Sequence, residues 1–325
     1  MERIDAGFAS TPNRPLTGID KVTSTLVQGL KNKDPEKRRL ALISLTNIFR
    51  GYYDEAEKIA GSPIQNKEKL LESLKNQIKP ILTKLINDEN EEVRSHVYEQ
   101  LVHVLGEESV PDLVKALDDP KNKNIKYYII SALERTGTKN VEAIRKLTNL
   151  AKNDPEPTVR RAAIDALART AGLSAYQTLI DALNDKDFEV KGHAASALGT
   201  LKDPRAIPNL VYILNDEELD NKKSPDYAFG FRGRAAIALA DLKAIKHLKD
   251  IYKAIDSGNH ETASGRETIR DSIIALGIFL KEKTIPQKDK NEIISKLKSL
   301  IQDPRYKDYS IDIKESFINA GLKQQ

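Results

Sequence analysis

Basic residues recur at one position of a repeated segment, and they are the most regular chemical feature of this sequence. The eight positions are Arg38, Arg94, Lys126, Arg160, Lys191, Arg232, Arg270 and Lys314. An Asp stands six residues before five of them, at Asp88, Asp154, Asp185, Asp226 and Asp308. Cations in register could follow a phosphate backbone. The recurring Asp instead favours ion pairs that hold the fold together.

The other reactive residue types do not combine into a recognisable site. The chain has no Cys, and among its five histidines His96 and His103 are seven residues apart without a carboxylate at matching spacing. It has no Gly-rich phosphate loop and no nucleophile elbow. We therefore predict a protein that is not an enzyme, with no catalytic residue, no metal and no cofactor.

The segments that carry the cations are similar to one another and predict helices. The sequence "DPEPTVRRAAIDALA" (154–168) aligns with "DKDFEVKGHAASALG" (185–199), with Leu167 opposite Leu198. Before several of these segments lies an apolar stripe at positions i, i+3, i+4 and i+7, as in "SVPDLVKALDD" and "AYQTLIDALND". Each repeat thus predicts a pair of helices, with the cation on the second. The predicted fold class is all-α.

The stretch "ALGTLKDPRAIPNLVYILND" (197–216) resembles HEAT repeats, specifically the short kind found in phycobilisome lyases. The resemblance extends from about residue 20 to the end. It implies a right-handed α-α superhelix, a HEAT-type solenoid of about eight helix pairs. It also implies that the Asp residues and cations form a structural ladder within and between repeats. We expect a flexible segment over 1–18 and a single solenoid over 19–325, with insertions near 51–69 and 216–230.

Aromatic and Arg side chains at two places are candidates for contacts with a partner. The stretch "SPDYAFGFRGR" (224–234) carries Tyr227, Phe229 and Arg234 in the second insertion. Tyr127 and Arg161 each follow a residue of the basic series on a second helix, and second helices line the concave surface in this family. Such residues suit a protein interface. The alternative, that the rings of the inserted loop pack on adjacent helices, stays open.

These features favour a scaffold or adaptor that binds a protein partner of unknown identity, acting as a monomer or as a subunit of a complex. Two alternatives remain: a lyase or chaperone-like factor acting on a modified or pigment-carrying protein, by family resemblance, and a nucleic-acid-binding solenoid. Nucleic acid is disfavoured because the net charge is only +4. No segment has the length and apolarity of a membrane span. We expect a cytoplasmic location, or an exported one if a leader has been removed.

Overall fold

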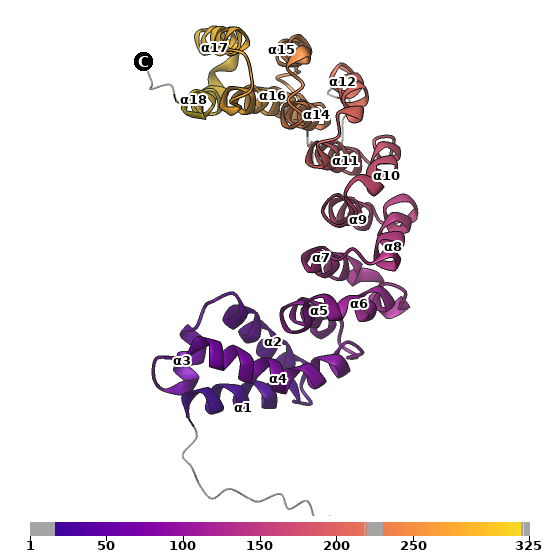
Figure 1. Ribbon diagram of the computed structural model, residues 1–325, viewed down its shortest axis with the longest axis vertical. Helices are drawn as coiled ribbons and strands as arrows, with labels where there is room; N and C mark the ends of the chain where they lie inside the picture. The colour runs from indigo at the N-terminus through magenta and orange to yellow at the C-terminus, as the bar shows by residue number, and fades with distance from the viewer. Residues whose placement is uncertain (1–16, 218, 220–229, 320, 322–325) are drawn as a thin grey trace, which may run out of the picture. The chain divides into compact units, whose positions relative to one another are not determined.

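The computed structural model describes residues 17–217, 219, 230–319 and 321, and every regular element in those ranges is a helix. The chain divides into two compact units, Met1–Ala132 (unit 1) and Leu133–Gln325 (unit 2). Figure 1 shows their helices. The all-α prediction is confirmed. The single solenoid over 19–325 stays a prediction, and the predicted flexible segment lies almost entirely outside the described residues.

Unit 1 contains two packed helix pairs, an additional helix and the start of a third pair. In the first pair α1 packs against α2, in the next α4 packs against α5, and α2 also contacts α5. The short helix α3, within the predicted insertion at 51–69, packs against α1. The elements are α1 (Gly18–Leu30), α2 (Pro35–Phe49), α3 (Asp54–Ala60), α4 (Lys67–Leu85), α5 (Glu91–Leu105), η1 (Gly106–Ser109), α6 (Val110–Ala116), η2 (Pro120–Ile125) and the first part of α7 (Lys126–Thr136).

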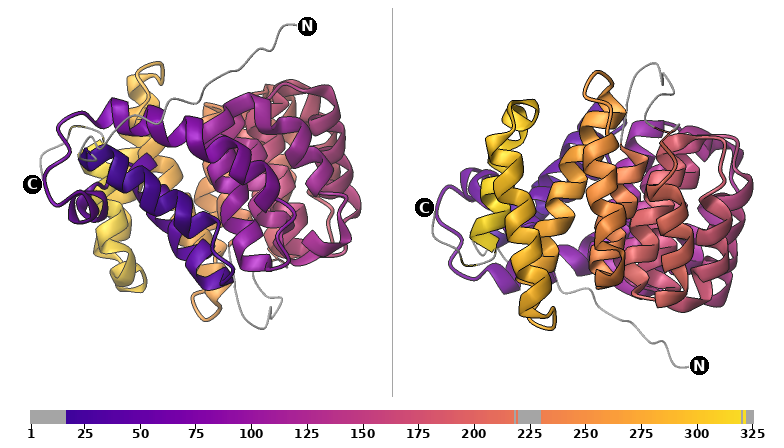
Figure 2. Two further views of the ribbon diagram at one scale, coloured as in Figure 1. Left: turned by 90° about the horizontal axis from the view of Figure 1, so that it is seen from below. Right: turned by 90° about the horizontal axis from the view of Figure 1, so that it is seen from above.

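Unit 2 consists of two rows of helices, which Figures 1 and 2 show from three directions. Each second helix contacts the next one, from α9 through α11, α14 and α16 to α18. The first helices α8, α10, α12, α15 and α17 pack on one side of this row. The elements are α8 (Val141–Asn153), α9 (Pro157–Thr170), η3 (Gly172–Ala175), α10 (Tyr176–Ala182), α11 (Phe188–Leu201), η4 (Pro204–Ala206), α12 (Ile207–Leu214), α14 (Phe231–Asp241), η5 (Ile245–His247), α15 (Leu248–Ser257), α16 (Ala263–Lys281), α17 (Gln287–Gln302), η6 (Pro304–Tyr309) and α18 (Ser310–Asn319).

The second helices are the elements on which the basic residues were predicted to lie. Helices α2, α5, α7, α9, α11, α14, α16 and α18 each contain one member of the basic series. A carboxylate or amide side chain caps many helix starts by accepting backbone hydrogen bonds. Asp34 accepts from Glu36 N at the start of α2, and Asp187 accepts from Glu189 N and Val190 N at the start of α11. Eight second helices in the described part of the chain confirm the prediction of about eight helix pairs.

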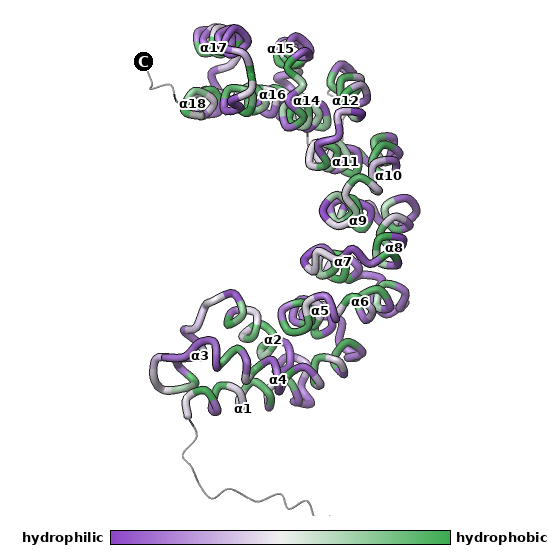
Figure 3. Tube along the Cα trace, viewed as in Figure 1, coloured by the Kyte–Doolittle hydropathy of each residue, from purple (hydrophilic) through white to green (hydrophobic). Residues whose placement is uncertain are grey.

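Small residues let the second helices of unit 2 approach one another closely. Ala163, Ala194 and Ala235 are fully buried. A Cβ atom at Gly199 of α11 would lie only 2.9 Å from Ala238 Cα of α14. Figure 3 shows hydrophobic and hydrophilic residues alternating along these helices, as expected for helices with one buried and one solvated face. The core is thus a series of thin layers between consecutive helices.

Candidate binding face

The cation of a second helix is anchored to two different turns, as Arg160 shows most clearly. Its side chain is only 3% exposed, and Nε and Nη2 each donate to the Asp185 carboxylate at 2.8 Å. Its Nη1 donates to the backbone carbonyls of Asp154 at 2.9 Å and Pro155 at 3.2 Å. The guanidinium group therefore joins the turn before its own helix to the turn before the next second helix.

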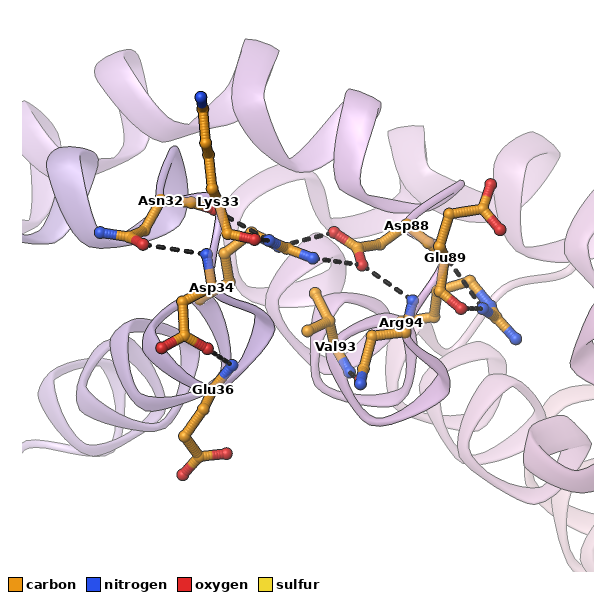
Figure 4. Close-up of polar contacts among 10 residues, drawn as sticks. Asn32, Lys33, Asp34, Glu36, Asp88, Glu89, Val93 and Arg94 are labelled. Carbon is orange, nitrogen blue, oxygen red and sulfur yellow. Dashed lines mark hydrogen bonds and ion pairs between the residues drawn. The ribbon is translucent and has the colours of Figure 1, made fainter.

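The same arrangement recurs in unit 1, which Figure 4 shows in close-up. Arg38 donates to Asp88 Oδ1 at 2.8 Å and to the carbonyls of Asn32 and Lys33. Asp88 in turn offers its own backbone carbonyl to Arg94 at 2.7 Å. Asp88 thus contributes its carboxylate to the preceding cation and its carbonyl to the cation six residues later, whereas Asp185 makes the first of these contacts and Asp154 makes the second. This refines the predicted ladder, because the six-residue spacing reflects a backbone contact.

Several members of the predicted ladder have other partners. Arg94 bonds to the amide oxygen of Asn122 at 2.9 Å in place of a carboxylate. Lys191 lies over the rings of Phe188 and Phe231, at 5.3 and 5.8 Å from their centroids.

The later repeats of unit 2 depart further from the ladder. Arg232 is fully buried and donates to Leu214 O at 2.9 Å. In α16 the backbone contacts are made by Arg266, which donates to the carbonyls five and six residues earlier, whereas Arg270 pairs with Glu267 and lies 3.7 Å from Asp312.

The remaining ladder candidates differ in their exposure. Lys314 and Asp308 are exposed and form no ion pair with a described residue. Lys126 is partly exposed, and Asp226 lies outside the described residues. Asp154 is buried, and its carboxylate accepts from Glu156 N at 3.1 Å.

Partly exposed polar side chains follow the side of the second-helix row that faces away from the first helices in unit 2. On α9, α11 and α16 they recur every three or four residues, so they share one helix face. We call this surface the inner face. Its polar members are Arg161, Asp165, Glu189, His193, Ser196, Arg234, Glu267, Arg270, Asp271 and Asp312.

Contacts between neighbouring helices fix many of these side chains. Between α9 and α11, Arg161 pairs with Glu189, and His193 Nδ1 lies 2.9 Å from Asp165 Oδ2. These pairs place acidic and basic groups side by side along the face. The inner face is therefore an ordered surface of mixed charge.

Arg234 lies across the next helix junction. Its Cδ atom is 3.0 Å from the position that a Cβ atom would take at Gly192 of α11, and its Nη1 donates to Ser196 Oγ at 3.3 Å. The missing side chain at Gly192 leaves the space that the stem of Arg234 fills. Arg234 thus connects α14 to α11 while its guanidinium group stays partly exposed.

Asp271 is the most perturbed carboxyl group on the inner face. Burial raises its pKa to about 6, and the negative charge of Glu267 adds to the rise; Arg234 and Arg270 oppose it, and Asp312 adds a smaller rise. A Cβ atom at Gly233 would lie 2.6 Å from Asp271 Cβ and 2.9 Å from its Oδ2. The carboxyl group is therefore pressed against the backbone of α14.

The predicted contact residues fall in three places. Arg161 and Arg234 lie on the inner face, and Tyr227 and Phe229 lie outside the described residues. Tyr127 is 54% exposed at the start of α7, where its ring meets Tyr128 edge-on at 5.7 Å. The structure thus brings two of the five predicted residues to one surface.

Sequence reasoning missed the His193–Asp165 pair and Asp271. Neither belongs to a motif, because these residues meet across helices rather than along one. The signal that could have found them is the repeat alignment itself: Asp165 follows Arg160 by five residues, and His193 follows Lys191 by two. Predicting the contact between Asp165 and His193 also requires knowing how the two helices are offset along their axes.

The described residues contain no candidate metal centre. No group of three or more His, Asp or Glu side chains in that part of the chain is arranged to hold a metal ion. Two clefts occur on other surfaces, one in unit 1 beside Tyr98 and Asn122 and one in unit 2 beside Lys152 and Asp181. None of the described helices has the length and apolarity needed to cross a membrane.

Comparisons with known proteins agree with the repeat pattern. A family model described as HEAT repeats matches residues 69–134 and 144–224. No curated protein sequence matches the chain.

Among solved structures, an engineered protein is 20% identical, with a TM-score of 0.40 over 93% of this chain and 89% of that one. The complex of CpcE and CpcF of phycocyanin lyase from Nostoc sp. PCC7120 is 16% identical, with a TM-score of 0.43 over 90% and 97%. Human deoxyhypusine hydroxylase is 18% identical, with a TM-score of 0.34 over 82% and 98%. TM-scores this low say nothing about function. The family match and the paired helices together show that the chain contains HEAT repeats, over residues 69–134 and 144–224.

Proposed function

We propose that this chain is a non-enzymatic scaffold that holds a protein partner on the inner face of unit 2. The observation that supports this is the ordered set of acidic and basic side chains along successive second helices. Arg161, Glu189, Asp165 and His193 are already held by contacts between helices. A surface that is ordered before binding loses less side-chain entropy when a partner docks.

The distribution of the cations also disfavours a nucleic-acid partner. The ladder arginines that would have formed a basic stripe point into the protein, where Arg160 and Arg38 bond to carboxylates and carbonyls. The cations left on the inner face stand beside carboxylates such as Glu189 and Glu267. A phosphate backbone would therefore meet repulsion as well as attraction along this surface.

A partner that fits this surface would present both charges in an extended arrangement. Rim charges of this kind mainly set the association rate and its dependence on salt. Binding should thus weaken moderately as the ionic strength rises, without the steep loss that counterion release gives with nucleic acid.

Affinity capture from a lysate of the source organism, with and without nuclease, tests this function when matched variants are included. Arg161→Ala removes an inner-face cation, and Arg145→Ala removes a cation of α8 that is likewise paired with a Glu, at Glu142. We expect a protein partner that survives nuclease and is lost with Arg161→Ala but kept with Arg145→Ala. Capture of nucleic acid alone, or equal loss with both variants, would contradict the proposal.

A further inference from the structure

The junction of α14, α16 and α18 contains a carboxyl group that has no bonded partner among the described residues. No hydrogen bond and no ion pair within the described residues involves the Asp271 carboxylate. It lies against the α14 backbone at Gly233, where the absence of a side chain makes room for it. A carboxylate in such a position has lost part of its hydration without gaining a donor, which is unfavourable only when it is ionised.

The charged groups around Asp271 do not compensate for this loss. Arg234 of α14 and Arg270 of α16 favour the ionised form, whereas Glu267 of α16 and Asp312 of α18 oppose it. Arg270 is itself paired with Glu267 and lies near Asp312, so these two carboxylates already balance much of its positive charge. Within the described residues, the charges that act on Asp271 come from these three helices; α15 and α17, which also pack against α16, add none.

We propose that Asp271 is a proton-sensitive contact, which holds α14 and α16 together more firmly when its carboxyl group is protonated than when it is ionised. Mild acid would then stiffen this end of the second-helix row, and neutral or alkaline pH would loosen it. Because the pKa of Asp271 is raised to about 6, its carboxyl group changes protonation state between neutral and mildly acidic pH. The proposal concerns the fold alone and does not depend on the binding function.

Carboxyl-group NMR titration of the full-length protein tests the first step directly. We expect the Asp271 resonance to titrate with a midpoint near pH 6, as given by burial and by Glu267. Glu267→Gln removes the neighbouring negative charge and should move the midpoint toward lower pH. A midpoint near the ordinary value of about 4 in the unmodified protein would overturn the proposal.

Amide hydrogen exchange at pH 5 and pH 8, corrected for intrinsic rates, tests the second step. The opening equilibrium constants of α14 and α16 should be larger at pH 8 by roughly tenfold, since only about one pKa unit, from pH 5 to the folded-state value near 6, separates the two conditions and one unit corresponds to a factor of ten. Asp271→Asn should abolish this difference, whereas Asp181→Asn, at an exposed carboxylate of α10 paired with Lys152, should preserve it. A pH difference that persists in Asp271→Asn would refute the assignment.

Discussion

Replacing Asp185 by Asn tests the ladder, because it removes one charge from a buried ion pair without changing the size of the side chain. Asp185 is 12% exposed and its partner Arg160 only 3%. An Asn can still accept the hydrogen bond that Asp187 N donates at 2.8 Å. It must, however, place an uncharged oxygen or an amide donor against the guanidinium group, which stays buried.

The expected loss of folding free energy depends on the hydrogen bonds that Arg160 retains in the variant. Breaking a buried pair by removing one partner typically costs about 3–5 kcal/mol. Because Nη1 still donates to the carbonyls of Asp154 and Pro155, we expect the lower part of this range, about 3–4 kcal/mol. The matched control is Asp181→Asn, which breaks a pair with Lys152 whose side chains are 45% and 41% exposed. Exposed pairs contribute only about 0.2–1 kcal/mol.

Urea unfolding followed by circular dichroism, with hydrogen exchange of α9 and α11 to localise the effect, measures both variants. Burial raises the pKa of Asp185, but the hydrogen bonds from Arg160 and Asp187 outweigh it and lower the pKa overall. A lowered pKa gives stability that is present above the ordinary value and is lost as the pH falls through the folded-state value. The difference between the two variants should therefore shrink below about pH 4. Equal costs for Asp185→Asn and Asp181→Asn at pH 7 would refute the ladder.

Three further substitutions have outcomes that follow from the structure. Gly199→Ala should destabilise unit 2 by about 1–3 kcal/mol, because the new methyl group meets the backbone of α14 at Ala238. Gly192→Ala meets only the flexible stem of Arg234 and should be neutral or stabilising by up to about 1 kcal/mol. Thermal unfolding of both variants measures this, and a larger loss of stability for Gly192→Ala would contradict the packing between α11 and α14. Asp271→Asn should stabilise the protein at pH 7.5 by about 1–3 kcal/mol. The raised pKa of Asp271 gives stability that is present below the ordinary value near 4 and is lost as the pH rises through about 6. The gain should therefore vanish at pH 4, and destabilisation at pH 7.5 would show that the ionised carboxylate has a partner.

The helix pairs followed from the sequence because the repeat imposes them locally. The apolar stripes of first helices and the small residues of second helices specify which faces are buried, and these patterns are visible in one segment at a time. For the same reason, the basic series identified the second helix of each pair. In Arg94 and Arg160, the cation contacts the backbone carbonyl of the Asp six residues before it rather than that Asp's carboxylate.

The inner face could be predicted only in part, because its contacts join different helices. Arg161 was identified through its place in the repeat, whereas Arg234 was predicted in the inserted loop and lies instead on α14. The partners of both residues depend on how neighbouring helices are offset along their axes. In α16, the backbone contacts predicted for Arg270 are made by Arg266, and this difference has a similar cause. This helix starts earlier relative to its cation than the other second helices do, so a sequence alignment matched a residue one turn too late.

Site-specific photo-crosslinking tests the central claim most directly. A photoreactive residue would replace Ser196 on the inner face or, as a matched position on the first-helix row, Tyr212, which is 76% exposed. If the protein is a scaffold that uses the inner face, a partner present in the lysate should be crosslinked at 196 and not at 212. Crosslinking at 212 alone, or crosslinks to nucleic acid at 196, would contradict it.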